Sequence, residues 1–140
     1  MKVLINITNH SQEQFPKEQK EYNENNYDKV IDLLSTTIEK NHHEEDIVVL
    51  AEGYRKSVSQ IIEALLKSHK YPEDLDVHVC VCGEWGLTYT LVNELKALSK
   101  SYQKVTYNRV YMDVVYPSTP RVENGNGKTV YQFYKYRRYL

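Results

Sequence analysis

The amino-acid sequence predicts one α/β domain with a mostly parallel sheet and a C-terminal antiparallel hairpin. Short β-branched apolar segments alternate along the chain with longer segments whose apolar residues recur at helical spacing. This alternation favours a parallel sheet, because a right-handed helical crossover is the usual way to bring the chain back to a parallel neighbour. Residues 123–127 read Glu-Asn-Gly-Asn-Gly, which is typical of a hairpin turn.

Length and charge limit what the chain can be. Its 140 residues suit a single domain spanning 1–140 that buries roughly two-thirds of the surface its unfolded form exposes. The 18 basic and 19 acidic side chains leave a formal charge of −1, which argues against unspecific binding to duplex nucleic acid or acidic lipid. The chain has neither a bilayer-length apolar run nor the pattern of a signal peptide. We therefore expect a cytoplasmic protein with no membrane partner.

The first third of the sequence predicts strand, helix and strand. Residues 3–8 form an apolar run that ends in turn-forming and helix-capping residues. Residues 11–23 are polar and predict a short solvent-facing helix, with Phe15 as its apolar anchor and Pro16 near its start. Residues 27–34 are short and apolar between polar segments, which favours a second strand.

The segment that begins DIVVL resembles a strand in isolation but predicts a long helix in context. Its apolar residues continue at steps of three and four to Leu65, and acidic residues 44–46 precede them, as the helix dipole prefers. Pro72 should end the helix. Residues 76–82 then predict a strand buried on both faces, which implies a central position in the sheet.

The remaining sequence predicts a helix and further strands. Gly83 to Gly86 break the strand, and Leu87, Leu91, Leu95 and Leu98 resume a helical stripe. Residues 105–116 predict a strand closed by residues 117–121, whose two prolines should forbid regular pairing. The tail from Tyr131 alternates, with odd-numbered residues on one side and even-numbered residues on the other.

Four polar loops should meet at one edge of this sheet. Residues 9–12, 35–37, 83–85 and 118–121 each follow a predicted strand. Because the carboxyl ends of parallel strands open on a common edge, and ligands bind where the strand order reverses, we expect one site at this edge.

The residue types in these loops suit a nucleotide. Backbone N–H groups near Gly83 and Gly86 could approach a phosphate at the helix N-terminus, and Arg121 could add a charged contact. Asn9 could read a base or ribose edge, and Trp85 offers a stacking surface. Short hydroxyl donors complete the set: Ser11, Thr88, Ser118 and Thr119.

Simpler interpretations remain open for several of these residues. Asn9, His10 and Ser11 could serve only as a helix cap, although His10 could also be a catalytic acid or base. Glu84 could be a general base or simply an acidic residue at a helix N-terminus. The turn matches neither the three-glycine dinucleotide fingerprint nor a P-loop, which disfavours an NAD enzyme or an NTPase.

No metal or cofactor is expected. His78, Cys80 and Cys82 share one strand face, but they would spread over ~13 Å, too far for one zinc ion. A thiol hydrolase that uses Cys82 with His10 is a further hypothesis. The aromatic and basic tail, YQFYKYRRYL, suits single-stranded nucleic acid or a dimer interface, and we favour the interface.

Four segments carry a family resemblance: VLINITNHS, VHVCVCGEWGLTYTLVNELK, STPRV and YQFYKYRRY. Together they resemble small bacterial proteins related to the CARF group, which includes the CRISPR-associated ring nucleases and acts in antiviral defence. The resemblance implies a Rossmann-like three-layer sandwich and binding, with or without metal-independent cleavage, of a cyclic oligoadenylate at a homodimer interface.

The resemblance also implies roles for individual residues. Asn9, His10 and Ser11 would line the pocket, Gly83 and Glu84 would cradle phosphate, and Arg121 would steady the scissile linkage. The sequence matches no complete catalytic set, so a ring nuclease, that is, a metal-independent phosphodiesterase, is one expectation and binding alone is the other. The alternative from another class is a non-enzymatic interaction protein that uses its Tyr-rich C-terminal hairpin.

Overall fold

A computed structural model describes residues 1–35, 37–68, 74–104, 109–123 and 125–140. Within these residues the main sheet has five strands in the order β2-β1-β3-β4-β7. The first four are parallel and β7 is antiparallel to β4, which confirms the predicted mostly parallel sheet. The strands are β1 (Lys2–Ile7), β2 (Lys29–Asp32), β3 (Leu75–Val81), β4 (Val110–Ser118) and β7 (Lys135–Arg138).

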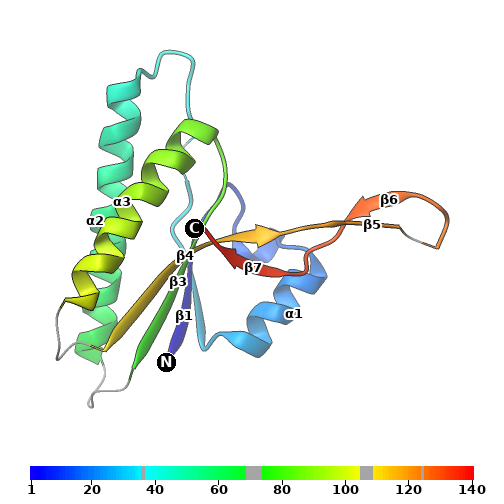
Figure 1. The fold of residues 1–140 in the computed structure, drawn as a ribbon, viewed down its shortest axis with the longest axis horizontal. Helices are drawn as coiled ribbons and strands as arrows, with labels where there is room; N and C mark the ends of the chain where they lie inside the picture. The colour runs from blue at the N-terminus through cyan, green and yellow to red at the C-terminus, as the bar shows by residue number, and fades with distance from the viewer. Residues whose placement is uncertain (36, 69–73, 105–108, 124) are drawn as a thin grey trace.

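Helices cover both faces of this sheet and complete a Rossmann-like sandwich (Figure 1). The helices α2 (Glu44–Ser68) and α3 (Trp85–Gln103) lie together on one face, and the shorter α1 (Lys17–Asn26) lies on the other. Between β1 and α1 the chain forms a short 3-10 helix, η1 (Gln12–Gln14). The predicted stop of α2 at Pro72 and the predicted strand start at residues 105–108 lie outside the described residues.

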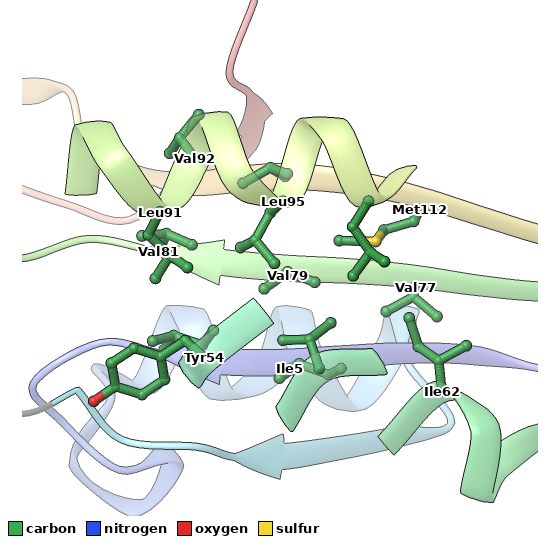
Figure 2. Packing of buried hydrophobic residues seen from close by; sticks show 14 of the residues in the cluster. Ile5, Tyr54, Ile62, Val77, Val79, Val81, Leu91, Val92, Leu95 and Met112 are labelled. Carbon is green, nitrogen blue, oxygen red and sulfur yellow. The ribbon is translucent and has the colours of Figure 1, made fainter. Parts of the chain in front are cut away.

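The main core fills the space between the sheet and the helix pair α2 and α3 (Figure 2). Alternate strand residues face the helices, and the helical stripes predicted from the sequence face the sheet. DIVVL therefore begins a helix and not a strand, since its continuation buries Ala51, Tyr54, Val58, Ile62 and Leu65 along one side. Arg55 of α2 donates to Glu94 of α3 at 2.9 Å and ties the two helices together.

The central position predicted for residues 76–82 is confirmed. β3 pairs with β1 on one side and with β4 on the other, so neither of its edges is open. Val77, Val79 and Val81 belong to the main core, whereas Cys80 belongs to a second cluster on the α1 side. Strand order reverses between β1 and β3, because β1 leads to β2 on one side and the chain later continues from β3 to β4 on the other.

The predicted solvent-facing helix is present as α1, although it begins at Lys17 and one of its sides is buried. α1 is polar, yet Gln19 and Asn23 are buried against the sheet side of the molecule. The Tyr136 hydroxyl of β7 joins them, since it accepts from Gln19 Nε2 at 3.0 Å and donates to Asn23 Oδ1 at 2.9 Å. A polar helix packs here because its amides find a buried hydrogen-bond partner.

The expectation that two prolines end β4 also needs correction. β4 continues through Pro117 to Ser118 and pairs with β7 over this length. Val114 O accepts from Tyr139 N, so Pro117 falls at the alternate position, where its missing N–H is not required by β7. On its other side, Pro117 lies beyond the end of β3 at Val81.

The C-terminal hairpin is antiparallel, as predicted, but it stands apart from the main sheet. β5 (Arg121–Glu123) and β6 (Thr129–Tyr131) form their own two-stranded sheet and extend away from the domain (Figure 1). The predicted single alternation of the tail is wrong, because the chain is irregular between β6 and β7. Phe133 and Tyr136 are consequently both buried, three positions apart.

Candidate functional site

The loops that follow β1 and β3 lie side by side at the reversal of strand order. A Cβ atom built on Gly83 would lie 3.5 Å from Asn9 Oδ1, so the two loops are in van der Waals contact. This convergence is what parallel strands produce at their carboxyl edge. Two cavities open here, and the consecutive residues Gly83 and Glu84 line one each.

The first cavity, which we call the polar cleft, has a volume of about 360 Å³ and lies at the switch point itself. It is lined by Asn9, Ser35, Thr37, Ile38 and Glu84. Ser35 Oγ donates to Asn9 Oδ1 at 2.8 Å, and Ser35 N donates to Thr8 O at 3.1 Å. Because the Asn9 carbonyl oxygen is held by Ser35, the Asn9 amide nitrogen is the group left to donate to a ligand.

Glu84 caps helix α3 with its own carboxylate. Gly86 N donates to Glu84 Oε1 at 3.1 Å and Leu87 N donates to Glu84 Oε2 at 2.7 Å. These are two of the N–H groups in the first turn of the helix, which otherwise attract an anion. The predicted phosphate cradle at Gly83 and Gly86 is therefore already filled by a carboxylate of the chain, and the helix-end interpretation of Glu84 is the one that the structure supports.

The second cavity, which we call the aromatic pocket, has a volume of about 430 Å³ and lies between α3 and the C-terminal residues. Two aromatic side chains on the first turns of α3 are largely exposed there, Trp85 at 89% and Tyr89 at 74%. Lys96 lies two turns further along the same helix face. The lining comprises Cys82, Gly83, Trp85, Thr88, Tyr89, Val92, Asn93, Lys96, Tyr139 and Leu140.

A buried hydrogen-bond network holds the loop after β1 in place. Asn6 is fully buried, and its Nδ2 donates to His10 O at 2.7 Å and to Asp32 Oδ1 at 2.9 Å. Thr8 Oγ1 donates to Asn6 Oδ1 at 2.7 Å, and Gln12 N donates to Asp32 Oδ1 at 3.1 Å. The loop that carries Asn9 is thus fastened to the end of β2 by satisfied polar groups.

His10 and Ser11 line neither cavity. His10 is exposed, and its backbone carbonyl oxygen accepts a hydrogen bond from Asn6 Nδ2. Ser11 is the N-cap of η1, and its N–H donates to Gln14 Oε1 at 3.1 Å. The capping interpretation of this segment holds for Ser11.

The shared edge does not include Ser118, Thr119 and Arg121. Ser118 Oγ accepts from Arg137 Nε at 2.9 Å, and Thr119 is exposed beyond it. Arg121 lies on β5 of the projecting hairpin, with its guanidinium 5.8 Å from the ring centre of Tyr131. The fourth predicted loop does not join the other three, because β4 runs past the end of β3 before the chain turns into β5.

His78 and Cys80 of β3 have structural roles. His78 Nδ1 lies 2.7 Å from the Tyr27 hydroxyl, and Cys80 is fully buried. Cys82 lies just after β3 and is exposed, but it lines the aromatic pocket, where partial burial raises the pKa of its thiol. A raised pKa disfavours the thiolate that nucleophilic catalysis needs, which argues against the hydrolase based on Cys82 and His10.

Sequence reasoning identified Asn9, Gly83, Glu84, Trp85 and Thr88 at this edge but missed the rest of the aromatic pocket. Tyr89 and Lys96 were overlooked, although they follow Trp85 at helical spacing and therefore share its face. Tyr139 was assigned to an alternating tail, and only the tertiary structure brings it beside α3.

The fold and the two cavities define a Rossmann-like α/β protein with a candidate ligand site at the carboxyl edge of its sheet. Residues 2–137 match the family described as "Uncharacterized protein MJ1673 family", and the chain belongs to that family. The comparisons with curated proteins and with solved structures returned no match. Among the described residues, no helix has the length and apolar character needed to cross a membrane.

Proposed function

We propose that this protein binds a nucleotide across Gly83, with the ribose in the polar cleft and the base in the aromatic pocket. The observation that carries the proposal is that Gly83 and Glu84, at the switch point, line adjoining cavities of opposite character. A nucleoside has the matching halves, a polyhydroxyl sugar and a planar aromatic base.

The polar cleft suits hydroxyl groups better than a phosphate. Glu84 contributes a carboxylate, which accepts from hydroxyl donors, and Asn9 contributes an amide donor. A phosphate beside Glu84 would meet a like charge, and the helix N–H groups are already used by that carboxylate. We therefore assign ribose, rather than phosphate, to this cleft.

The aromatic pocket suits a base. Trp85 and Tyr89 present exposed rings, and stacking of a base on an aromatic side chain is worth about 1–3 kcal/mol. Adenine nucleotides are the first ligands to test, because the sequence resembles the CARF group. Cyclic oligoadenylate bound at a symmetric dimer remains part of this proposal.

The proposal is for binding without cleavage. Cleavage of a ribose–phosphate linkage needs a positioned base and a cation at the reacting phosphate. His10 and Arg121, the residues expected to supply them, do not line either cavity.

A binding assay with matched variants tests this function. Adenosine, adenosine monophosphate and cyclic tetraadenylate are the ligands to screen by thermal shift. We expect at least one of them to raise the melting temperature of the protein. Trp85→Ala should abolish the shift, whereas Tyr111→Ala, which removes a 57% exposed tyrosine from β4, should retain it. No shift with any of these ligands, or an equal shift in Trp85→Ala, contradicts the proposal.

A second function, self-association of the protein, is favoured by the hairpin. Every described residue of β6 is exposed, as are both ends of β5, and an isolated two-stranded hairpin is marginally stable on its own. Pro120 O accepts from Gln132 N, so residues 121–131 can be replaced by an Asn-Gly turn without disturbing β7. Loss of self-association in the shortened protein would support this function, and unchanged association would exclude the hairpin as its surface.

A further inference from the structure

The aromatic pocket continues into a third cavity along α3. This cavity has a volume of about 260 Å³, and it shares Lys96 and Tyr139 with the aromatic pocket. Its lining comprises Lys96, Ser99, Lys100, Gln103, Met112, Asp113, Val114 and Tyr139. We call the two cavities together the α3 groove. From Trp85 to Lys100 the groove follows the helix for about 22 Å at 1.5 Å per residue.

The floor of the groove at the junction of the two cavities is fixed. Tyr139 OH donates to Val81 O at 2.7 Å, and the Tyr139 ring packs on Tyr116 with centroids 4.9 Å apart. The ring is therefore held between the end of β3 and β4. A ligand that extends beyond the aromatic pocket would pass over Tyr139 towards the lysines.

The far end of the groove carries positive charge and is lined in part by β4. Lys96 and Lys100 lie one helical turn apart and face the same cavity, where Asp113 is the acidic residue. Arg109 O accepts from Leu75 N of β3. The backbone N–H and C=O groups of the odd-numbered residues of β4 therefore point towards β3. The N–H of Met112 consequently points away from β3, at a part of β4 where β7 has not yet begun to pair.

We infer that the α3 groove binds a single-stranded oligonucleotide, with one base at Trp85 and Tyr89 and the phosphates of nucleotides further along the strand at Lys96 and Lys100. This inference rests on the proposed nucleotide binding and extends it from one nucleotide to several. Aromatic rings in one cavity can stack a base, and lysines in the neighbouring cavity, which shares Lys96 and Tyr139 with the first, can pair with phosphates of the same strand.

The length of the ligand and the salt dependence of binding test the inference. Linear tetraadenylate should bind roughly tenfold more tightly than adenosine monophosphate, since each exposed ion pair adds roughly two- to fivefold. The logarithm of the dissociation constant should rise with the logarithm of salt concentration at a slope of about 0.7 for each phosphate contact. Lys100→Ala should lower that slope by about 0.7 and leave binding of the monophosphate unchanged.

Matched controls separate failure of this inference from failure of the proposed function. Lys56→Ala removes an exposed lysine of α2 and should alter neither the slope nor the affinity. If the monophosphate binds at Trp85 but tetraadenylate binds no more tightly, or if Lys100→Ala leaves the slope unchanged, the oligonucleotide inference is overturned and nucleotide binding stands. If neither ligand binds, the oligonucleotide inference is overturned, and the proposed function is overturned as well when adenosine and cyclic tetraadenylate also fail to bind. Equal affinity for tetraglutamate would show that charge alone is recognised, and it would also overturn the inference.

Discussion

At the residue scale, Glu84 shows how one side chain decides what a site can bind. Its carboxylate accepts from two N–H groups at the start of α3, and the same carboxylate lines the polar cleft. A phosphate would have to displace it, whereas a ribose hydroxyl can donate to it without doing so. The chemical group that the polar cleft can bind therefore depends on the Glu84 carboxylate that caps α3.

Replacement of Glu84 tests this cap. Glu84→Ala should reduce the free energy of unfolding by about 1 kcal/mol, because it leaves two helix N–H groups without their side-chain acceptor. Glu84→Asp, which is also a good N-cap, should retain most of the stability. Urea denaturation of the three proteins measures the difference, and an unchanged midpoint in Glu84→Ala would contradict the capping role.

His78 makes the stability of the fold depend on pH. Burial, and secondarily the charge of Lys2, lowers the pKa of His78 below its ordinary value of 6.5. The unfolded chain then binds a proton more readily than the folded protein does. The contribution of His78 to stability is fully present above pH 6.5 and is lost as the pH falls through the lower pKa of the folded state.

The His78→Gln variant isolates this contribution. Glutamine can still bond the Tyr27 hydroxyl but does not titrate, so the variant should lose less stability than the wild type between pH 7.5 and pH 5.5. Urea midpoints at the two pH values measure the loss in each protein. Equal losses would show that His78 does not contribute to the pH dependence.

At the element scale, β7 connects the sheet with helix α1. It pairs with β4, and its Tyr136 hydroxyl bonds Gln19 and Asn23 of α1. Tyr136 also packs edge-on against Tyr22 and Phe133. The sequence could not show this, because the partners lie 113 and 117 positions away from Tyr136.

Removal of one oxygen atom tests the link between β7 and α1. Tyr136→Phe should cost about 1–3 kcal/mol, since it keeps the ring but leaves the buried amides of Gln19 and Asn23 without their partner. Tyr134→Phe, at a side chain that is 62% exposed, should change stability by less than about 0.5 kcal/mol. Similar urea midpoints for the two variants would contradict the structural role of the Tyr136 hydroxyl.

At the scale of the whole molecule, the sequence was sufficient for the parts of the fold that local patterns determine. The continuous apolar run of β3 indicated its central position, and the periodicity after residue 44 separated α2 from a strand. The juxtaposition of Asn9 with Gly83 followed from parallel topology alone.

The remaining features depend on tertiary interactions that local patterns do not encode. Pro117 is accommodated in β4 because β3 ends before it. Arg121 lies on the projecting hairpin because β4 extends to Ser118. The network of Asn6 and Asp32 joins residues that are 26 positions apart. Tyr139 reaches α3 only because β7 returns antiparallel to β4.

The most direct measurement uses the tryptophan at the centre of the candidate site. The chain has a single tryptophan, Trp85, and it lies in the aromatic pocket. Adenine nucleotides should therefore change its fluorescence in a saturable way, and Asn9→Ala should require a higher nucleotide concentration for half-saturation. If the ratio of initial to observed fluorescence instead rises linearly with concentration and does not saturate, as in collisional quenching, no base stacks on Trp85 and the nucleotide site is not at this edge.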